Sequence, residues 1–130
     1  MEDQLNPATV ACRGLRGATT VAENQPDEVA TVTLELISAL LERNDCARED
    51  VAAVIFTLTD DLAGASPAAA LRDHGWDTVP LMMVREHDSQ TLPGCIRVLL
   101  MINTRRTAAE LQHVYLRGSE ILRPDLAVAS

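Results

Sequence analysis

The chain has 130 residues, a length that suits one domain with a single modest core. Hydrophobic residues make up 47% and charged residues 23%, which is ordinary globular usage and excludes wholesale disorder and a fibrous structure. The formal net charge of -8 and the aromatic content of 2% disfavour nucleic acid as a partner, and the charge also disfavours an anionic membrane.

Residues 1–11 carry no hydrophobic periodicity, so we interpret them as a flexible N-terminal extension. Residues 12–21 are typical of a strand, although this run holds two glycines and two arginines. Gly14 and Gly17 flank Arg16, and they either leave space for a ligand beside it or mark a β-bulge.

A helix is predicted to begin at Pro26, since proline suits the first helical position and apolar residues then recur at helical spacing. Asn44 marks its predicted end. Residues 51–58 are almost continuously apolar, which is typical of a central strand covered on both faces.

A short helix is predicted from Ser66 and Pro67 to a stop at Gly75. Residues 78–84 then predict another strand. Pro80 lies within this run and lacks a backbone N–H, which indicates an edge or irregular position.

Residues 96–102 predict a strong strand, and residues 113–116 predict a last short one. Between them, Thr107 and Glu110 have the spacing of a capping box, which predicts the start of a short helix.

The predicted strands alternate with helices, but the connections are too uneven for a regular doubly wound sheet. We therefore predict an α/β (α+β) fold, with a mixed β-sheet and helices on one side. Its other face or its open edges would need a partner chain, so oligomerisation is expected. The predicted domain spans residues 12–126, and residues 127–130 form a C-terminal tail.

Arg97 is the most informative candidate for a functional site. A period of two places it with Leu99 and Met101 on one strand face, and both faces are otherwise apolar. An unpaired buried charge is costly, so an anion must meet the guanidinium. That anion is either a protein carboxylate, which spacing alone slightly favours, or a ligand carboxylate, which the planar fork of arginine matches.

Arg13 and Arg16 raise the same question on the first strand. Because they are three residues apart they point to opposite faces, so at most one of them shares a pocket with Arg97. Glu86 follows the third predicted strand and is either a solvated carboxylate or a contact to a polar ligand.

The remaining reactive side chains predict no cofactor and no metal site. Cys12, Cys46 and Cys95 form no C-x-x-C pair, which is typical of reduced thiols in a cytoplasmic protein. The three histidines lack metal-ligand spacing, and nucleotide-binding and nucleophile motifs are absent from the sequence. No apolar run approaches the roughly 20 residues of a membrane span, and the first residues do not form a signal peptide, so we expect a soluble protein.

Five short segments of the sequence, taken together and in this order, are characteristic of one protein family. They are R-G-L-R-G-A-T-T-V from Arg13, V-P-L-M-M-V-R-E from Val79, C-I-R-V-L-L from Cys95, H-V-Y-L from His113 and L-R-P-D-L from Leu122. In this order they resemble the AroH-class chorismate mutases, and the similarity spans nearly the whole of residues 12–126.

The resemblance implies a homotrimeric pseudo-α/β-barrel with three active sites at the subunit interfaces. It also implies the rearrangement of chorismate to prephenate, a step of the shikimate pathway to phenylalanine and tyrosine. This reaction is unimolecular, so it needs no acid, base or nucleophile. It needs a compact substrate conformer and positive charge near the breaking C–O bond, and arginines supply both.

The resemblance also implies a role for each site residue by its position. Arg16 would bind a substrate carboxylate, and Arg97 would contact the ether oxygen and a carboxylate. Glu86 would meet the ring hydroxyl, while Tyr115 would hydrogen-bond the side-chain carboxylate. Arg97, Glu86 and Arg16 are thus the implied catalytic residues, and the rest of the substrate-binding set is Tyr115, Met82, Met83 and Arg72 from the neighbouring subunit.

Three positions depart from the family pattern. Ser66 stands where a bulky aromatic residue is usual, Ala69 where a Lys is usual, and Met83 where a Cys is usual. The first two departures remove a lid contact and a charge, which predicts weaker substrate binding more than a slower chemical step.

Two other functions remain compatible with the sequence. One is a catalytically weakened trimeric module of the same fold that binds small anions. The other is an oligomeric scaffold in which Arg97 pairs permanently with Glu86.

Overall fold

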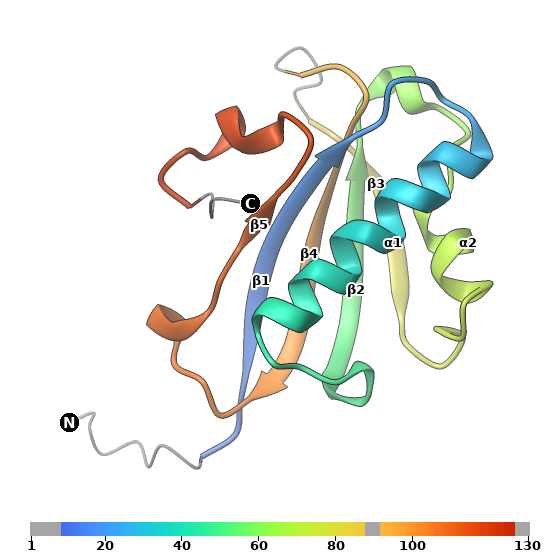
Figure 1. Ribbon diagram of the computed structural model, residues 1–130. Helices are drawn as coiled ribbons and strands as arrows, with labels where there is room; N and C mark the ends of the chain where they lie inside the picture. Colours follow the sequence, from blue (N-terminus) through green and yellow to red (C-terminus); the bar gives the residue numbers. More distant parts are fainter. Residues whose placement is uncertain (1–8, 88–91, 127–130) are drawn as a thin grey trace.

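The computed structural model describes residues 9–87 and 92–126, and its five strands form one mixed sheet in the order β3-β2-β4-β1-β5 (Figure 1). The strands are β1 (Ala11–Thr20), β2 (Val51–Leu58), β3 (Leu81–Arg85), β4 (Cys95–Thr104) and β5 (Val114–Tyr115). β4 is antiparallel to β1 and β2, whereas β3 runs parallel to β2 and β5 parallel to β1. The predicted mixed sheet is confirmed.

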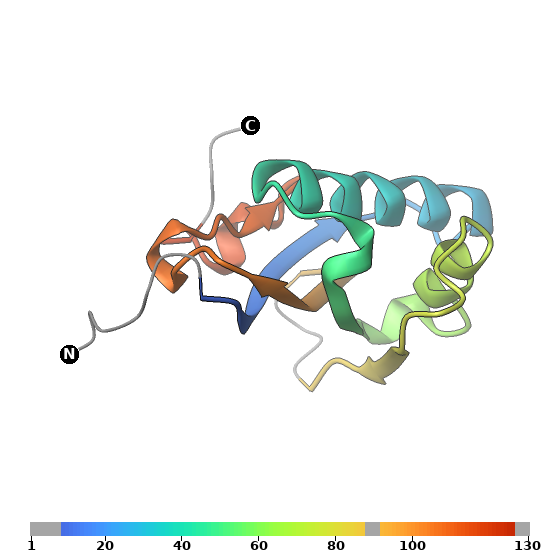
Figure 2. The same ribbon diagram turned by 90° about the horizontal axis from the view of Figure 1, so that it is seen from below.

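Two helices, α1 (Pro26–Arg43) and α2 (Pro67–Arg72), cover one face of this sheet (Figures 1 and 2). The helix face holds the main core, in which side chains of α1 such as Leu36 and Leu40 pack with strand residues such as Phe56 and Leu100. Neither α1 nor α2 lies over the opposite face, called the open face below (Figures 1 and 2). The prediction of helices on one side is therefore confirmed.

The predicted start and end of α1 are both confirmed. Pro26 takes the first helical position, and the chain leaves the helix at Asn44. The buried amide of Asn44 donates to the carbonyls of Leu40 and Gln112, each at 2.8 Å, and its oxygen accepts the Gln112 N–H at 2.7 Å. Asn44 therefore ties the end of α1 to the segment that leads into β5.

Gly17 serves neither of the purposes that the sequence predicted for it. The register between β1 and β4 is continuous, so there is no bulge. Gly17 faces α1, and a Cβ atom there would lie 3.0 Å from Leu40 Cδ1 and 3.1 Å from Leu36 Cδ1. The glycine therefore makes room for the helix and not for a ligand.

The other strands differ from the prediction in extent. β3 begins at Leu81 and not at residue 78, because the chain is still turning at Val79, whose N–H donates to Trp76 O. β3 is an edge strand, as Pro80 indicated. The prediction that β2 is covered on both faces was wrong for the single chain, since only the side chains on its helix face are fully buried.

Two short segments complete the architecture. The capping box of Thr107 and Glu110 forms, but it starts only a single 3-10 turn rather than a longer helix. α2 begins where predicted, because Ser66 Oγ accepts the Ala69 N–H at 3.0 Å. Within the described residues, no helix is long and apolar enough to span a membrane.

Candidate functional site

The strand register places Arg16 and Arg97 on the open face. Arg97 lies opposite Ala18 of β1 and Thr57 of β2, while Arg16 lies opposite Leu99, two residues along β4 from Arg97. Side chains two residues apart on a strand share a face. Both guanidinium groups therefore belong to the same surface.

Arg13 lies on the other face, as its spacing from Arg16 predicted. It is paired with the buried Ile102, and its Nε donates to the Arg106 carbonyl at 2.9 Å. Arg13 is therefore excluded from the group that contains Arg97.

Arg97 and Glu86 form an ion pair at the end of β3, with 3.3 Å between Arg97 Nε and Glu86 Oε1. The Nε–H makes no hydrogen bond within the described residues, so the contact is one of charge and not a directed hydrogen bond. The Arg97 side chain is 37% exposed and that of Glu86 15%. Of the two anions that the sequence left open for Arg97, a protein carboxylate, that of Glu86, lies beside it in the single chain, and the guanidinium is less buried than the strand pattern predicted.

Thr57 and Cys95 complete the surroundings of this pair. Thr57 Oγ1 donates to Glu86 Oε1 at 2.6 Å, the same oxygen that faces Arg97. Burial raises the pKa of the Cys95 thiol, and the nearby Arg97 guanidinium opposes that rise. Cys95 is therefore a neutral thiol packed beside the ion pair.

Tyr115 lies in a small second core on the open face, buried with Ala18 and Cys95 under side chains of the C-terminal segment. Burial raises the pKa of its hydroxyl, and the charges of Arg16, Arg123 and Arg97 oppose the rise. The phenol is therefore a neutral hydrogen-bonding group close to three guanidinium groups.

Arg123 is a residue of this cluster that the sequence reasoning did not select. It forms a two-pronged pair with Asp125, at 3.0 Å from Nε to Oδ1 and 2.8 Å from Nη2 to Oδ2. The L-R-P-D-L segment that supported the family resemblance contains both residues, and that was the available signal.

His113 fixes the backbone beside Arg16. Its Nδ1 accepts the Arg16 N–H at 2.9 Å, so the neutral tautomer carries its proton on Nε2. Burial lowers the pKa of His113, and the charges of Arg16 and Arg123 lower it further. His113 therefore stays neutral and serves a structural purpose.

The remaining predicted residues are divided between the two faces. Met82 belongs to the open face and is 58% exposed, whereas Met83 is paired with the buried Phe56 and points to the helix side. Arg72 ends α2, also on the helix side, and is exposed. The single chain thus groups Arg16, Arg97, Glu86, Tyr115 and Met82, and it leaves Arg72 and the Met83 side chain apart.

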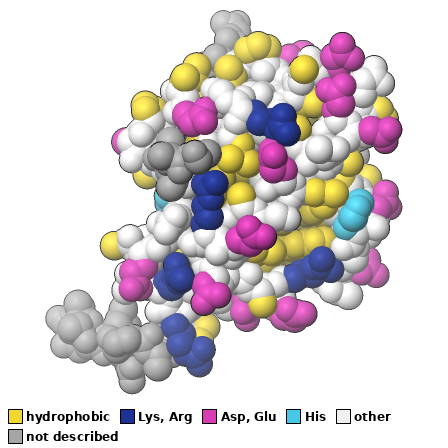
Figure 3. All heavy atoms as spheres, in the orientation of Figure 1, with side chains coloured by type: hydrophobic (Ala, Val, Ile, Leu, Met, Phe, Trp, Pro, Cys, Tyr) yellow, Lys and Arg dark blue, Asp and Glu magenta, His cyan; other side chains and the backbone are white. Residues whose placement is uncertain are grey.

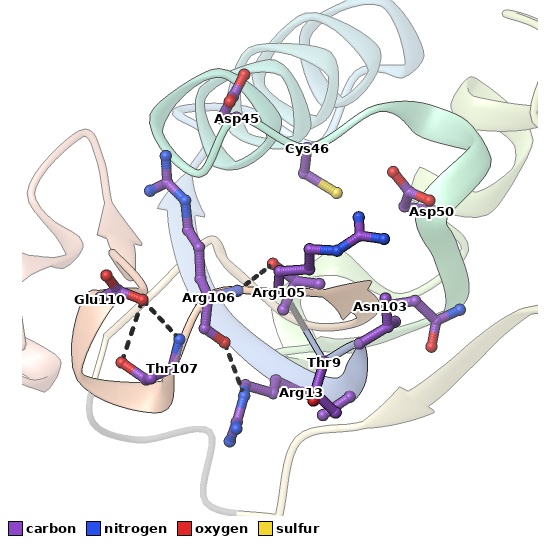
Figure 4. A pocket seen from close by; sticks show the side chains of 13 residues that line it. Thr9, Arg13, Asp45, Cys46, Asp50, Asn103, Arg105, Arg106, Thr107 and Glu110 are labelled. Carbon is purple, nitrogen blue, oxygen red and sulfur yellow. Dashed lines mark hydrogen bonds between the residues drawn. The ribbon is translucent and has the colours of Figure 1, made fainter. Parts of the chain in front are cut away.

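Another cavity and the face that carries α1 lie away from the group of Arg16, Arg97, Glu86, Tyr115 and Met82. A cavity of about 660 Å³ lies where β4 ends, between Arg105 and Arg106 on one wall and Asp45 and Asp50 on another (Figure 4). Acidic and arginine side chains are spread over the face that carries α1 (Figure 3). Within the described residues, no group of three histidine, cysteine or acidic side chains could hold a metal ion.

The fold and this cluster define a one-domain α+β protein that gathers arginines, a carboxylate and a phenol on the helix-free face of its sheet. The model of the family "Chorismate mutase type I" matches residues 12–126. The chain therefore belongs to the type I chorismate mutases, a family of isomerases.

Individual relatives agree with the family match. The chain is 46% identical to the chorismate mutase AroH of Thermus thermophilus over 119 residues, covering 90% of this chain and 98% of the relative. It is 37% identical to the chorismate mutase AroH of Bacillus subtilis over 118 residues, covering 89% and 93%. Its fold is similar to a solved chorismate mutase from Clostridium thermocellum, with a TM-score of 0.80, 39% identity and coverage of 84% of this chain and 98% of that one.

Proposed function

We propose that the chain is a cytoplasmic chorismate mutase that converts chorismate to prephenate on the open face of the sheet. The observation that carries the proposal is the placement of Arg16 and Arg97 on one face, with Glu86 beside Arg97. Chorismate is a dianion, and guanidinium groups match carboxylates with paired hydrogen bonds. The surface therefore suits a small doubly charged substrate.

Each residue then has a task that its surroundings support. Arg16 binds one substrate carboxylate, and Arg97 contacts the ether oxygen and a carboxylate. Tyr115, whose pKa burial raises, donates a hydrogen bond from its hydroxyl to the side-chain carboxylate. Glu86 accepts from the ring hydroxyl, and Met82 contributes apolar contact.

Catalysis on this surface rests on positioning and charge. Holding both carboxylates keeps the substrate in the compact conformer in which its reacting carbons are close. The Arg97 guanidinium stabilises the negative charge that develops on the ether oxygen as the C–O bond breaks. No proton moves and no covalent intermediate forms.

The active unit is a homotrimer in which α2 of one subunit reaches the open face of the next. Apolar side chains on that face, including Met82, Val84 and Leu99, are between 38% and 58% exposed in the single chain. Such a patch is typical of an interface between subunits. Arg72 lies on the opposite side of its own sheet, so it serves the site of a neighbour, and Met83 takes part through its backbone.

The test follows chorismate disappearance with purified protein and with an Arg97→Ala variant. We expect a clear rate increase from the native protein and a loss of about 100-fold or more in the variant, because one preorganised charge-stabilising donor is removed. Arg105→Ala, just beyond the far end of β4, is the control and should keep its rate. Binding of a transition-state analogue without any rate increase would instead support an anion-binding module.

A further inference from the structure

Thr57 occupies a central place on the open face. On β2 it lies opposite Arg97 of β4 on one side and Val84 of β3 on the other. Its hydroxyl donates to Glu86 Oε1 at 2.6 Å, and the bond is partly buried. Thr57 thus connects the two charged residues of the candidate site.

Two groups therefore share one oxygen of Glu86. Thr57 Oγ1 donates to Oε1, and Arg97 Nε lies 3.3 Å from the same atom without a directed hydrogen bond. Oε2 accepts no hydrogen bond from residues 9–87 and 92–126. Among the described residues, hydrogen bonding therefore holds the carboxylate by Oε1 alone.

An arginine and a carboxylate in contact frequently form two parallel hydrogen bonds. Arg117 and Glu35 form such a two-pronged pair in this chain, and so do Arg123 and Asp125. Arg97 and Glu86 do not, and Thr57 is the group that occupies the oxygen between them. A full pair would neutralise Arg97 and would compete with a ligand carboxylate.

We propose that Thr57 is a positioning residue for the mutase reaction, which holds Glu86 by Oε1 so that Oε2 accepts the substrate hydroxyl and Arg97 stays available to the substrate. The inference rests on the proposed function. Thr57 itself does not touch the substrate; it acts through Glu86.

The test compares Thr57→Val, which keeps the size and the branched Cβ, with Thr57→Ser, which keeps the hydroxyl. A hydrogen bond to a charged group contributes enough that Thr57→Val should lower kcat/KM by about tenfold or more. Thr57→Ser should stay within about threefold of the native value.

A double-mutant cycle separates this role from a general loss of stability. In a Glu86→Gln background, Thr57→Val should cause little further loss of rate, since the residue acts through Glu86. The proposal is overturned if Thr57→Val keeps the native kcat/KM, if Thr57→Ser falls as far as Thr57→Val, or if the two losses simply add.

A crystal structure of Thr57→Val gives a readout that does not depend on activity. We expect Glu86 and Arg97 to form two parallel hydrogen bonds in the variant, and an unmoved Glu86 would contradict the proposal. If the native protein does not accelerate chorismate rearrangement, the proposed function fails, while this structural comparison still decides what Thr57 does to Glu86.

Discussion

Ser66 has a structural contact that its departure from the family pattern did not reveal. By sequence, it replaces a bulky aromatic residue of the family pattern. In the structure its hydroxyl caps α2 by accepting the Ala69 N–H at 3.0 Å. Such a cap typically stabilises a helix by about 1 kcal/mol. Ser66 therefore has a structural purpose in α2.

Ala69 carries the clearest prediction at the scale of one residue. It lies half-buried on α2, the helix that we propose reaches a neighbouring site. Ala69→Lys should lower KM for chorismate, because an added ammonium group attracts the dianion. Steady-state kinetics beside Ala69→Met, which has comparable length without charge, would isolate the effect of charge. An unchanged or higher KM in the Lys variant would count against this reading.

At the scale of elements, β1 contains two glycines, Gly14 and Gly17, whose surroundings differ. A Cβ atom at Gly17 would lie 3.0–3.2 Å from Leu40, Leu36 and the Val114 carbonyl. At Gly14 the nearest atom would be Leu99 Cδ1 at 3.2 Å, at the end of a half-exposed side chain. Only the first site is enclosed by a helix and by backbone.

Gly17→Ala should therefore lower the free energy of unfolding by about 1–3 kcal/mol, the usual range for overpacking a core. Gly14→Ala should cost clearly less, since Leu99 can move aside. Urea unfolding of both variants measures the difference. Equal losses would mean that β1 tolerates no side chain at either position and that α1 is not the cause.

Elements defined by local signals were predicted well from the sequence. The limits of α1 follow from Pro26, Asn44 and the spacing of apolar residues, and β2 matches residues 51–58 in full. The start of β3 was misplaced, because a turn hydrogen bond at Val79 prevailed over the strand pattern.

The candidate site was predicted less completely, because it depends on contacts between distant segments. Periodicity separated Arg13 from Arg16 correctly. It could not show that Glu86 meets Arg97, since that contact requires β3 and β4 to lie on either side of β2. Periodicity also could not show that Thr57 hydrogen-bonds Glu86, because nothing in an otherwise apolar run distinguishes this hydroxyl.

At the scale of the whole molecule, the proposed site is completed by a second subunit. Arg97 and Arg72 lie on opposite sides of one sheet, so a site that uses both needs two chains. Inactive Arg97→Ala and Arg72→Ala proteins should regain activity when they are unfolded together and refolded in equal amounts.

In that mixture, random assembly gives about a quarter of the sites a native Arg97 from one chain and a native Arg72 from its neighbour. Activity assays and mass determination of the mixed assembly check this prediction. A mixture that stays at the level of its parents, although mixed trimers have formed, would place both arginines in the same subunit's site.

The pairing of β1 with β4 also governs how the chain can fold as it is made. Arg13 meets Arg106, 93 positions further along. At synthesis rates of about 5–20 residues per second, β1 waits several seconds for its partner strand. Its apolar side chains have only α1 to shelter them during that interval, so the nascent chain depends on early docking of this helix to avoid premature association.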